Sequence, residues 1–280
     1  MRKNLFWLSD EQWERIEPHL PRDVRGVERV DDRRVISGIV HILKTGCRWC
    51  DCPPEYGPPT TIYNRFVRWA RRGVWETLFR KLAGSGRSTD TQMIDSTHIK
   101  AHRSAVGGKG GEKKQAVGRS RGGRNTKIHA LADAKGRLIA ILLTGGQAHD
   151  CPAAERLIRR VKKPKRMLGD KAYDSAKLRE ELDENGTKPV IPNRSNRKQP
   201  SSFSKRLYKL RRPIEAAFNR LKDFRRIATR YDKLGSGLIK SSSARFGAFP
   251  TSSRQPLPRA HSTAENDPGQ HAPTRWARSS

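Results

Sequence analysis

The sequence predicts a mixed α/β domain that is preceded by a small all-α domain. Three observations lead to this fold class. Residues 5–83 have the spacing of amphipathic helices, residues 90–234 alternate short apolar strands with helices, and two of the strand-like runs end in an aspartate. Helices on a mixed sheet form an α/β architecture, and its reactive groups gather where strands end. We therefore expect the chemistry at a sheet edge in the second domain.

Residues 5–83 read as a compact helical unit. Ser9 and Gln12 have the spacing of a capping box at the start of the first helix, and Gly46 ends a second helix with one apolar face. The stretch IYNRFVRWARRG then predicts a basic helix. Its outward-facing arginines are Arg65, Arg68, Arg71 and Arg72. Two helices joined by a turn, with the second one basic, are typical of a helix-turn-helix that binds DNA. A helical bundle with a solvated arginine face fits the pattern equally well.

Residues 90–234 have a different pattern. TQMID and RMLGD read as short buried strands that end in Asp95 and Asp170. KIHALADAKGRLIAILLTGG, which lies between them, reads as an antiparallel hairpin. Helices are expected after the hairpin and after the second strand. The result is a mixed sheet with helices beside it.

The charge of the chain indicates its partner. Of 280 residues, 59 are Lys or Arg and 28 are Asp or Glu, which gives a formal net charge of +31. So large a charge repels itself unless a polyanion screens it, and nucleic acid is the obvious polyanion. An anionic membrane is the weaker alternative, because no apolar run approaches the ~18 residues that a spanning helix needs. The polar N-terminus does not resemble a signal peptide, so we expect the protein in the cytoplasm, at the nucleoid.

Two segments, residues 103–127 and 194–212, are strongly basic and are expected to be flexible loops. Such loops can close on a phosphate backbone without reading its sequence. Plain disorder is the competing interpretation. Around the first loop, the candidate phosphate contacts are Lys100, Arg103, Arg124 and Lys127.

The cysteines Cys47, Cys50 and Cys52 form a C-x-x-C-x-C motif that could indicate zinc. A structural zinc site usually has four ligands, and no second Cys or His pair follows at a regular distance. We therefore interpret these residues as ordinary reduced cysteines.

Three acids are the candidate catalytic and metal-binding residues: Asp95, Asp170 and Glu215. Two carboxylates at the ends of separate strands in one sheet can converge, and they destabilise each other unless a cation lies between them. Three carboxylates can hold two Mg²⁺ ions ~3.5–4 Å apart for in-line phosphoryl transfer, and Mn²⁺ can substitute. The competing interpretation is that acids lie by chance at strand ends, as they do in many proteins.

The third acid lies in the segment YKLRRPIEAAFNRLK. If this segment is helical, Tyr208, Arg211, Glu215 and Lys222 lie within roughly 60° of one another, at about 100° per residue. The carboxylate would then bind metal, while the phenol and the two cations hold phosphate oxygens nearby. Pro213 fits the first turn of a helix that begins near Arg211 but would kink a longer one.

Several motifs, in order along residues 5–234, resemble one family. Y-x2-R-x3-E-x6-K matches Tyr208 to Lys222 without a spacing error, DKAY begins at Asp170, and IDSTHIKAHRSA contains Asp95. These motifs resemble DDE transposases of the insertion-sequence-four and insertion-sequence-five superfamily. FWLSDEQWERIEPHLP and YNRFVRWARRGVWETL are similar to the insertion-sequence-five branch in particular.

The resemblance implies a ribonuclease-H-like catalytic fold in residues 90–234 and a two-metal mechanism. It also implies cleavage at the element's inverted ends and transfer of the 3′-hydroxyls into target DNA. Because two ends are cut together, a homodimer or a higher synaptic complex is expected. Two alternatives remain: a metal-dependent nuclease without a transfer step, and a decayed, catalytically inactive copy that only binds the ends.

The sequence departs from the family after Leu234. Relatives continue with an apolar helix, whereas residues 235–280 are rich in Ser, Pro and Arg and have no helical or strand period. We expect this atypical tail to be disordered. The altered tail favours a decayed copy, while the intact motifs favour an active enzyme.

Overall fold

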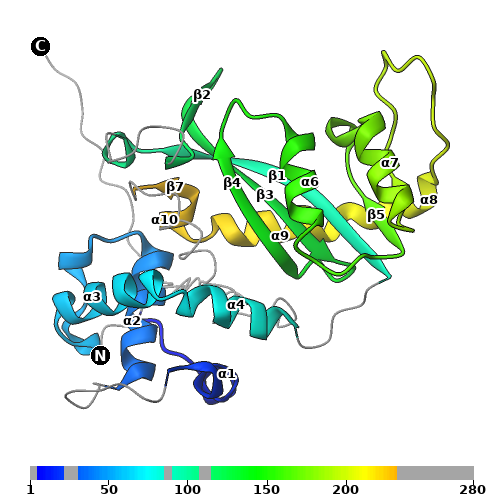
Figure 1. Cartoon of the computed structure of the whole chain (residues 1–280). Helices are drawn as coiled ribbons and strands as arrows, with labels where there is room; N and C mark the ends of the chain where they lie inside the picture. Colours follow the sequence, from blue (N-terminus) through cyan, green and yellow to red (C-terminus); the bar gives the residue numbers. More distant parts are fainter. Residues whose placement is uncertain (1–4, 22–30, 85–89, 107–114, 232–280) are drawn as a thin grey trace, which may run out of the picture.

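The computed structural model describes residues 5–21, 31–84, 90–106 and 115–231. A cluster of helices from the first part of the chain lies beside a twisted sheet built from the second part (Figure 1). The predicted tail, residues 235–280, lies outside the described residues, as do residues 107–114 of the first basic loop. No helix among the described residues is long and apolar enough to cross a membrane.

The helical unit begins as the sequence predicts. The Ser9 hydroxyl accepts from the Gln12 backbone N–H, and the Gln12 side chain accepts from the Ser9 N–H, so the predicted capping box is confirmed. Gly46 ends the second helix in the left-handed conformation, at φ +80°. The four α-helices in the described part of this unit are α1 (Asp10–Ile16), α2 (Asp32–Thr45), α3 (Pro59–Arg71) and α4 (Val74–Gly84).

The sheet has seven strands among the described residues. They are β1 (Thr91–Ala101), β2 (Gly118–Ser120), β3 (Gly123–Asp133), β4 (Leu138–Gly145), β5 (Arg166–Leu168), β6 (Lys188–Val190) and β7 (Thr229–Arg230). The central order is β4-β3-β1-β5-β6, with β3 antiparallel to β1 and to β4, and with β5 and β6 parallel to β1. This order and these directions are those of a ribonuclease-H-like sheet, and the predicted fold class is confirmed.

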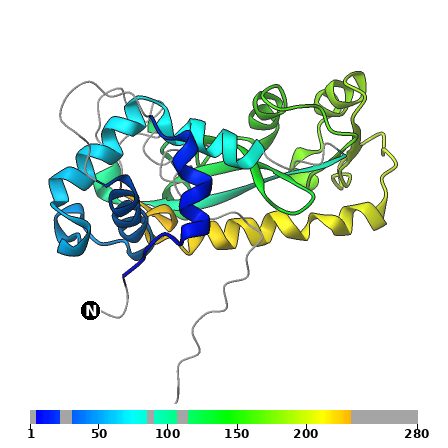
Figure 2. The same cartoon turned by 90° about the horizontal axis from the view of Figure 1, so that it is seen from below.

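Helices cover both faces of the sheet (Figure 2). On one face, α6 (Asp150–Ile158) and α7 (Ala176–Glu184) pack over a core that includes Ile94 and Leu131. The other face is covered by the run of α8 (Lys205–Tyr208), a 3-10 turn (Lys209–Arg211) and α9 (Arg212–Lys222), and by the N-terminal helices. Because side chains alternate along β1, Ile94 faces α6 while Met93 and Asp95 face α9.

The helical unit and the sheet share one hydrophobic core. A single cluster of buried side chains runs from Ile39 of α2 and Trp75 of α4 to Ile128 of β3 and Ile214 of α9. The short helix α10 (Arg225–Ala228), which follows α9, lies against α2. Its Arg226 donates to the Cys47 carbonyl at 3.2 Å. The two units are therefore packed together through an apolar interface.

Two predicted segments differ from the structure. The predicted strand TQMID continues to Ala101, because residues Gln92 to Lys100 pair with residues Asn125 to Asp133 of β3. Part of the predicted loop 103–127 is strand β2 and the start of β3, and the second predicted loop contains α8. Basic residues on exposed strands and helices look like loop residues in the sequence, and pairing between distant segments is not visible there.

Candidate active site

Asp95 lies on β1, and Asp170 follows the adjacent parallel strand β5. Met93 of β1 pairs with Leu168 of β5. Asp95 comes two residues after Met93, and Asp170 comes two residues after Leu168. Asp170 comes just after β5, where its carboxylate accepts from the Ala172 backbone N–H at 2.9 Å and caps the turn Lys171–Tyr173. The strand register thus brings both acids to one end of the β1–β5 pair.

Glu215 lies in the first turn of α9. Pro213 also lies in this turn, where its missing N–H leaves no helical hydrogen bond unmade. The buried face of the helix then carries Ile214, Ala217, Phe218 and Leu221, which pack on the sheet. Glu215 lies away from this buried face, near the surface and beside the strand that carries Asp95.

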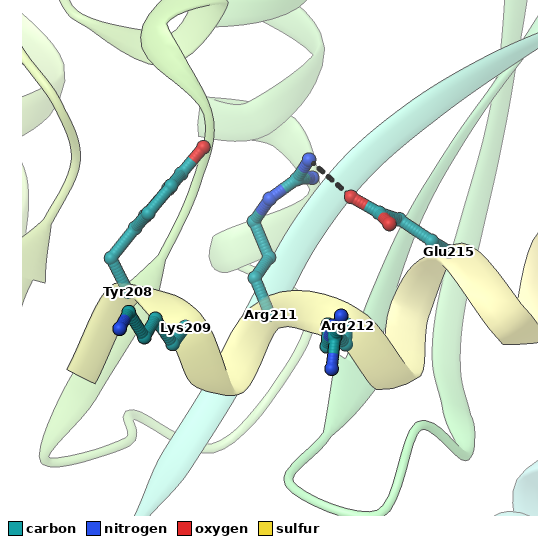
Figure 3. Close-up of a pocket in the computed structure, with 5 residues that line it drawn as sticks. All are labelled: Tyr208, Lys209, Arg211, Arg212 and Glu215. Atoms are coloured by element: carbon teal, nitrogen blue, oxygen red, sulfur yellow. Dashed lines mark hydrogen bonds and ion pairs between the residues drawn. The ribbon is translucent and has the colours of Figure 1, made fainter. Parts of the chain in front are cut away.

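Tyr208, Arg211 and Glu215 extend from one side of this helical run (Figure 3). Together with Lys209 and Arg212 they line a hollow of about 450 Å³. The Arg211 guanidinium also lies over the Tyr208 ring, 5.9 Å from its centroid. Lys222, at the end of α9, is exposed and is not among the residues that line the hollow.

Arg211 joins two of the three candidate acids. One of its terminal nitrogens, Nη1, lies 2.8 Å from Oδ2 of Asp95, and the other, Nη2, lies 2.8 Å from Oε1 of Glu215 (Figure 3 shows the second contact). The Asp95 and Arg211 side chains are 13 % and 14 % exposed, whereas Glu215 is 56 % exposed. The guanidinium therefore lies between the two carboxylates, largely out of solvent.

Burial raises the pKa of Asp95 above its ordinary range. The positive charge of Arg211 and a hydrogen bond from the Ser96 N–H lower this pKa, but less than burial raises it. The negative charge of Asp170 raises it further. The pKa of Asp95 thus stays above its ordinary value even beside Arg211, and a further cation would favour its ionised form.

The donor chemistry of the site suits a divalent metal ion. Asp95, Asp170 and Glu215 offer the hard carboxylate oxygens that Mg²⁺ prefers. The negative charge of Asp170 also raises the pKa of Asp95, as expected of two acids that a cation would bridge. In this conformation, however, no group of three or more His, Cys, Asp and Glu side chains in the described part of the chain is placed to hold a metal ion. The Arg211 guanidinium lies where Asp95 and Glu215 would have to converge.

Behind Asp95 lies a buried polar network that the sequence analysis missed. Asp150, at the start of α6, contacts Lys127 Nζ at 3.3 Å and His129 Nδ1 at 3.3 Å. Burial raises the pKa of Asp150, but hydrogen bonds from His129 and Ser96 and the charge of Lys127 outweigh it, and its pKa is about 2. Ser96 follows Asp95 directly, so this network supports the strand that carries the first acid.

Besides Arg211, two more of the predicted DNA contacts have partners inside the protein. Lys127 is buried and donates to the Ala148 carbonyl at 3.0 Å as well as to Asp150. Arg65 forms an ion pair with Asp32 in which both side chains are about one tenth exposed, and it lies over the Trp69 ring. The alternation of side chains along a strand could have indicated that Lys127 points inward. Outside the run from Tyr208 to Lys222, the other predicted contacts are exposed: Arg68, Arg71, Arg72, Lys100, Arg103 and Arg124.

The second basic segment is anchored next to Asp170. The buried Asp174 carboxylate accepts from Arg179 at 2.9 Å, from Arg197 at 2.7 Å and from the Arg194 backbone N–H at 2.7 Å. The Arg194 side chain donates to the Lys171 and Ala172 carbonyls. These contacts hold the start of the basic segment against the turn that follows Asp170.

Comparison with known families agrees with this fold and these motifs. Residues 86–236 match the family "Transposase DDE domain", which covers more than half of the chain. Residues 8–79 match the family described as "Putative transposase of IS4/5 family". The chain therefore belongs to the DDE transposases, and it is of the IS4/5 type.

Named relatives are consistent with this assignment. The chain is 39 % identical over 110 residues to a "Putative transposase for insertion sequence element IS6501" of Brucella ovis, a match that covers 39 % of this chain and 84 % of the relative. It is 35 % identical over 107 residues to a 16.2 kDa protein of insertion element IS402 of Burkholderia cepacia, covering 34 % and 73 %.

Solved structures give weaker matches. The piggyBac transposase in a synaptic complex with hairpin DNA is 12 % identical, with a TM-score of 0.46, over 86 % of this chain and 72 % of that one. The Mos1 transposase in a paired-end complex is 11 % identical, with a TM-score of 0.24, over 73 % and 82 %. The family assignment rests on the sequence matches.

Proposed function

We propose that this insertion-sequence transposase cleaves DNA at the inverted ends of its element and joins the 3′-hydroxyls to target DNA. The observation that carries the proposal is the grouping of acids and bases around one end of the β1–β5 pair. Asp95 and Glu215 contact the same guanidinium, and Asp170 follows the strand beside Asp95. A hollow lined with basic residues adjoins them. Phosphoryl transfer needs both acids for metal and cations for phosphate.

Asp95, Asp170 and Glu215 are the proposed catalytic residues and metal ligands. When bound, two Mg²⁺ or Mn²⁺ ions supply activation of the attacking oxygen and stabilisation of the leaving oxygen. The residues of this chain hold the DNA in place beside the acids. Tyr208 and Arg211 contact phosphate from the hollow, and Lys222 extends the basic surface along α9.

The DNA approaches over two further basic surfaces in this proposal. One is the exposed face of α3 and the residue that caps its end, with Arg68, Arg71 and Arg72, within a DNA-binding unit of residues 5–83. The other lies at the far end of β1 and β3, with Lys100, Arg103 and Arg124, in the catalytic unit of residues 90–234. A homodimer or larger synaptic complex brings two ends together, and the reaction takes place at the chromosome in the cytoplasm.

The test is incubation of the full-length protein with labelled DNA that carries the inverted ends, with Mg²⁺ or Mn²⁺. We expect cuts at the end boundaries and joined strands, both reduced at least about a thousandfold in Asp95→Asn, as befits loss of a group that acts in the transition state. Asp183→Asn, which changes an exposed acid on α7, is the matched control and should cut normally.

The outcomes distinguish the alternatives. Cutting that survives in Asp95→Asn would overturn the proposed site. Cutting without joined products would indicate a nuclease. Binding to the ends without any cutting would indicate a decayed copy that competes for the ends.

A further inference from the structure

Arg211 occupies the position that a metal ion would need. Its two terminal nitrogens each lie 2.8 Å from a carboxylate oxygen, one on Asp95 and one on Glu215. A cation held by both acids would have to lie between the same two carboxylates. In this conformation the guanidinium therefore supplies the positive charge next to two of the acids that the proposed function assigns to metal.

The two cations exclude each other. Asp95 is largely buried, and a buried carboxylate is stabilised by whichever positive charge lies beside it. If a divalent ion entered while Arg211 stayed, three positive charges would lie within a few ångströms in a poorly screened place. Metal entry at Asp95 and Glu215 therefore requires the Arg211 side chain to leave.

A hollow beside Arg211 could hold another anion. The hollow is lined by Lys209, Arg212 and Tyr208, so apart from Glu215 its charged groups are cationic. Lys209 and Arg212 are exposed and extend from the helix apart from the Arg211–Glu215 pair (Figure 3). Such a hollow fits a DNA phosphate, and a guanidinium binds phosphate through two nitrogens as readily as it binds carboxylates.

We propose that Arg211 is a gate that DNA opens: it holds Asp95 and Glu215 until a DNA phosphate in the adjoining hollow draws its guanidinium away, and only then do these acids bind metal. This inference rests on the proposed function, because it takes the three acids to be metal ligands. Its consequence is that metal loading depends on DNA, which keeps the protein from assembling an active site before an end is bound.

The test measures Mn²⁺ binding to the full-length protein by electron paramagnetic resonance, with and without a saturating inverted-end duplex in which cleavage is blocked. We expect the unaltered protein to bind Mn²⁺ at least about tenfold more tightly with DNA, the change that about 1.4 kcal/mol produces. Arg211→Gln should bind Mn²⁺ without DNA at least about tenfold more tightly than the unaltered protein, and DNA should then add less than about twofold.

Arg206→Gln is the matched control. It removes the same charge from exposed α8, where Arg206 contributes no side chain to the hollow, so its Mn²⁺ affinity without DNA should stay within about twofold of the unaltered protein. An equal gain in Arg206→Gln and Arg211→Gln would show a general effect of net charge and overturn the gate.

Two further outcomes separate the gate from the function on which it rests. If Asp95→Asn abolishes Mn²⁺ binding in the presence of the duplex but Arg211→Gln does not tighten Mn²⁺ binding in its absence, the gate is wrong and the metal site stands. If Asp95→Asn binds Mn²⁺ in the presence of the duplex as tightly as the unaltered protein does, the metal site itself is wrong. Should Arg211→Gln fail to fold, the unaltered protein still decides, because equal Mn²⁺ affinity with and without DNA excludes the gate.

Discussion

Arg65 and Lys127 are basic residues whose charged groups form ion pairs within the fold instead of facing the solvent. Each lies on an element whose other cations are exposed, yet Arg65 pairs with Asp32 and Lys127 pairs with Asp150. A charge that is shielded from water in this way is costly to leave without its partner. The two residues should therefore affect stability more than DNA affinity.

Arg65→Ala should lower the free energy of unfolding by about 2–4 kcal/mol, because it removes a largely buried ion pair and the packing of the guanidinium on Trp69. Arg68→Ala, one turn further along the same helix, is exposed and should change it by less than about 0.5 kcal/mol. Urea denaturation of both variants measures the difference. For DNA affinity we expect the reverse order, with the larger loss in Arg68→Ala. Equal stabilities of the two variants would contradict the assignment of Arg65 to the interior.

Asp150 gives a prediction for pH. Its pKa in the folded protein is about 2, below the ordinary value of 3.8, so its ionised form stabilises the fold above pH 4. That stabilisation, roughly 2 kcal/mol, is lost as the pH falls through the window between these two values. Between pH 5 and pH 3 the advantage of the unaltered protein over Asp150→Asn should shrink by roughly 1 kcal/mol.

Denaturant unfolding of both proteins at the two pH values measures this loss. The comparison with Asp150→Asn removes the contribution of the other carboxylates, which titrate in the same range in both proteins. An advantage that stays constant, or grows, as the pH falls would show that Asp150 is not held in its ionised form by Lys127, His129 and Ser96.

At the scale of helices and strands, the sequence predicted correctly the features that depend on neighbouring residues alone. The Ser9–Gln12 capping box and the Gly46 helix end depend only on nearby backbone, and the structure has both. Strand β1 runs on to Ala101 because β3 pairs with it, and that pairing joins residues about 25 or more positions apart. Its second half, which is more polar and only partly buried, gave no local indication of a strand.

The same distinction holds for the candidate site. Motif spacing could place Tyr208, Arg211 and Glu215 on one side of a helix, and they do line one hollow. Spacing could not show that Arg211 reaches across to β1, because that contact depends on how α9 packs on the sheet. The Asp150 network was missed for the same reason, since its members come from β1, β3 and the start of α6.

The junction of α2 and α10 can be tested through two glycines. Gly46 has φ +80°, and a Cβ on it would lie 2.9 Å from the Cβ of Arg225 on α10. Gly73 has φ +71° but nothing within 4 Å of such a Cβ. Gly73→Ala should therefore cost only backbone strain, about 1 kcal/mol, whereas Gly46→Ala should cost about 1–2 kcal/mol more because α10 must shift.

Thermal or urea unfolding of the two variants measures this difference. Since α10 follows the helix that carries Glu215, Gly46→Ala should also weaken end cleavage more than Gly73→Ala does at a temperature where both are folded. Equal losses of stability would mean that α10 does not depend on its contact with the end of α2.

At the scale of the whole molecule, the sequence divides into two units while the structure packs them into one core. The sequence shows a change of pattern near residue 84, and the two matched families also meet there. Side chains on both sides of that point nevertheless belong to one buried cluster, from α2 and α4 to β3 and α9. A sequence pattern identifies where an element type changes, but it does not show whether the apolar faces on either side cover each other.

This shared core predicts that the helical unit and the sheet unfold together. Five of the six tryptophans, Trp7, Trp13, Trp49, Trp69 and Trp75, lie in the helical unit, and the sixth, Trp276, lies in the tail. In a Trp276→Phe background, fluorescence therefore reports on the helical unit alone. Leu157 is fully buried on α6, on the face of the sheet away from that unit. Leu157→Ala should destabilise the sheet by about 3 kcal/mol through the cavity it leaves.

If the core is one cooperative unit, Leu157→Ala should lower the denaturation midpoint seen by tryptophan fluorescence as much as the midpoint seen by far-ultraviolet circular dichroism. The helical unit would then be placed rigidly against the sheet, and DNA bound on α3 would be held in a defined position relative to Asp95. Ala176→Gly at the exposed start of α7 is the control and should shift both midpoints only slightly. A fluorescence midpoint that stays unchanged while the dichroism midpoint falls would show two independent units and a hinge between DNA binding and the acids.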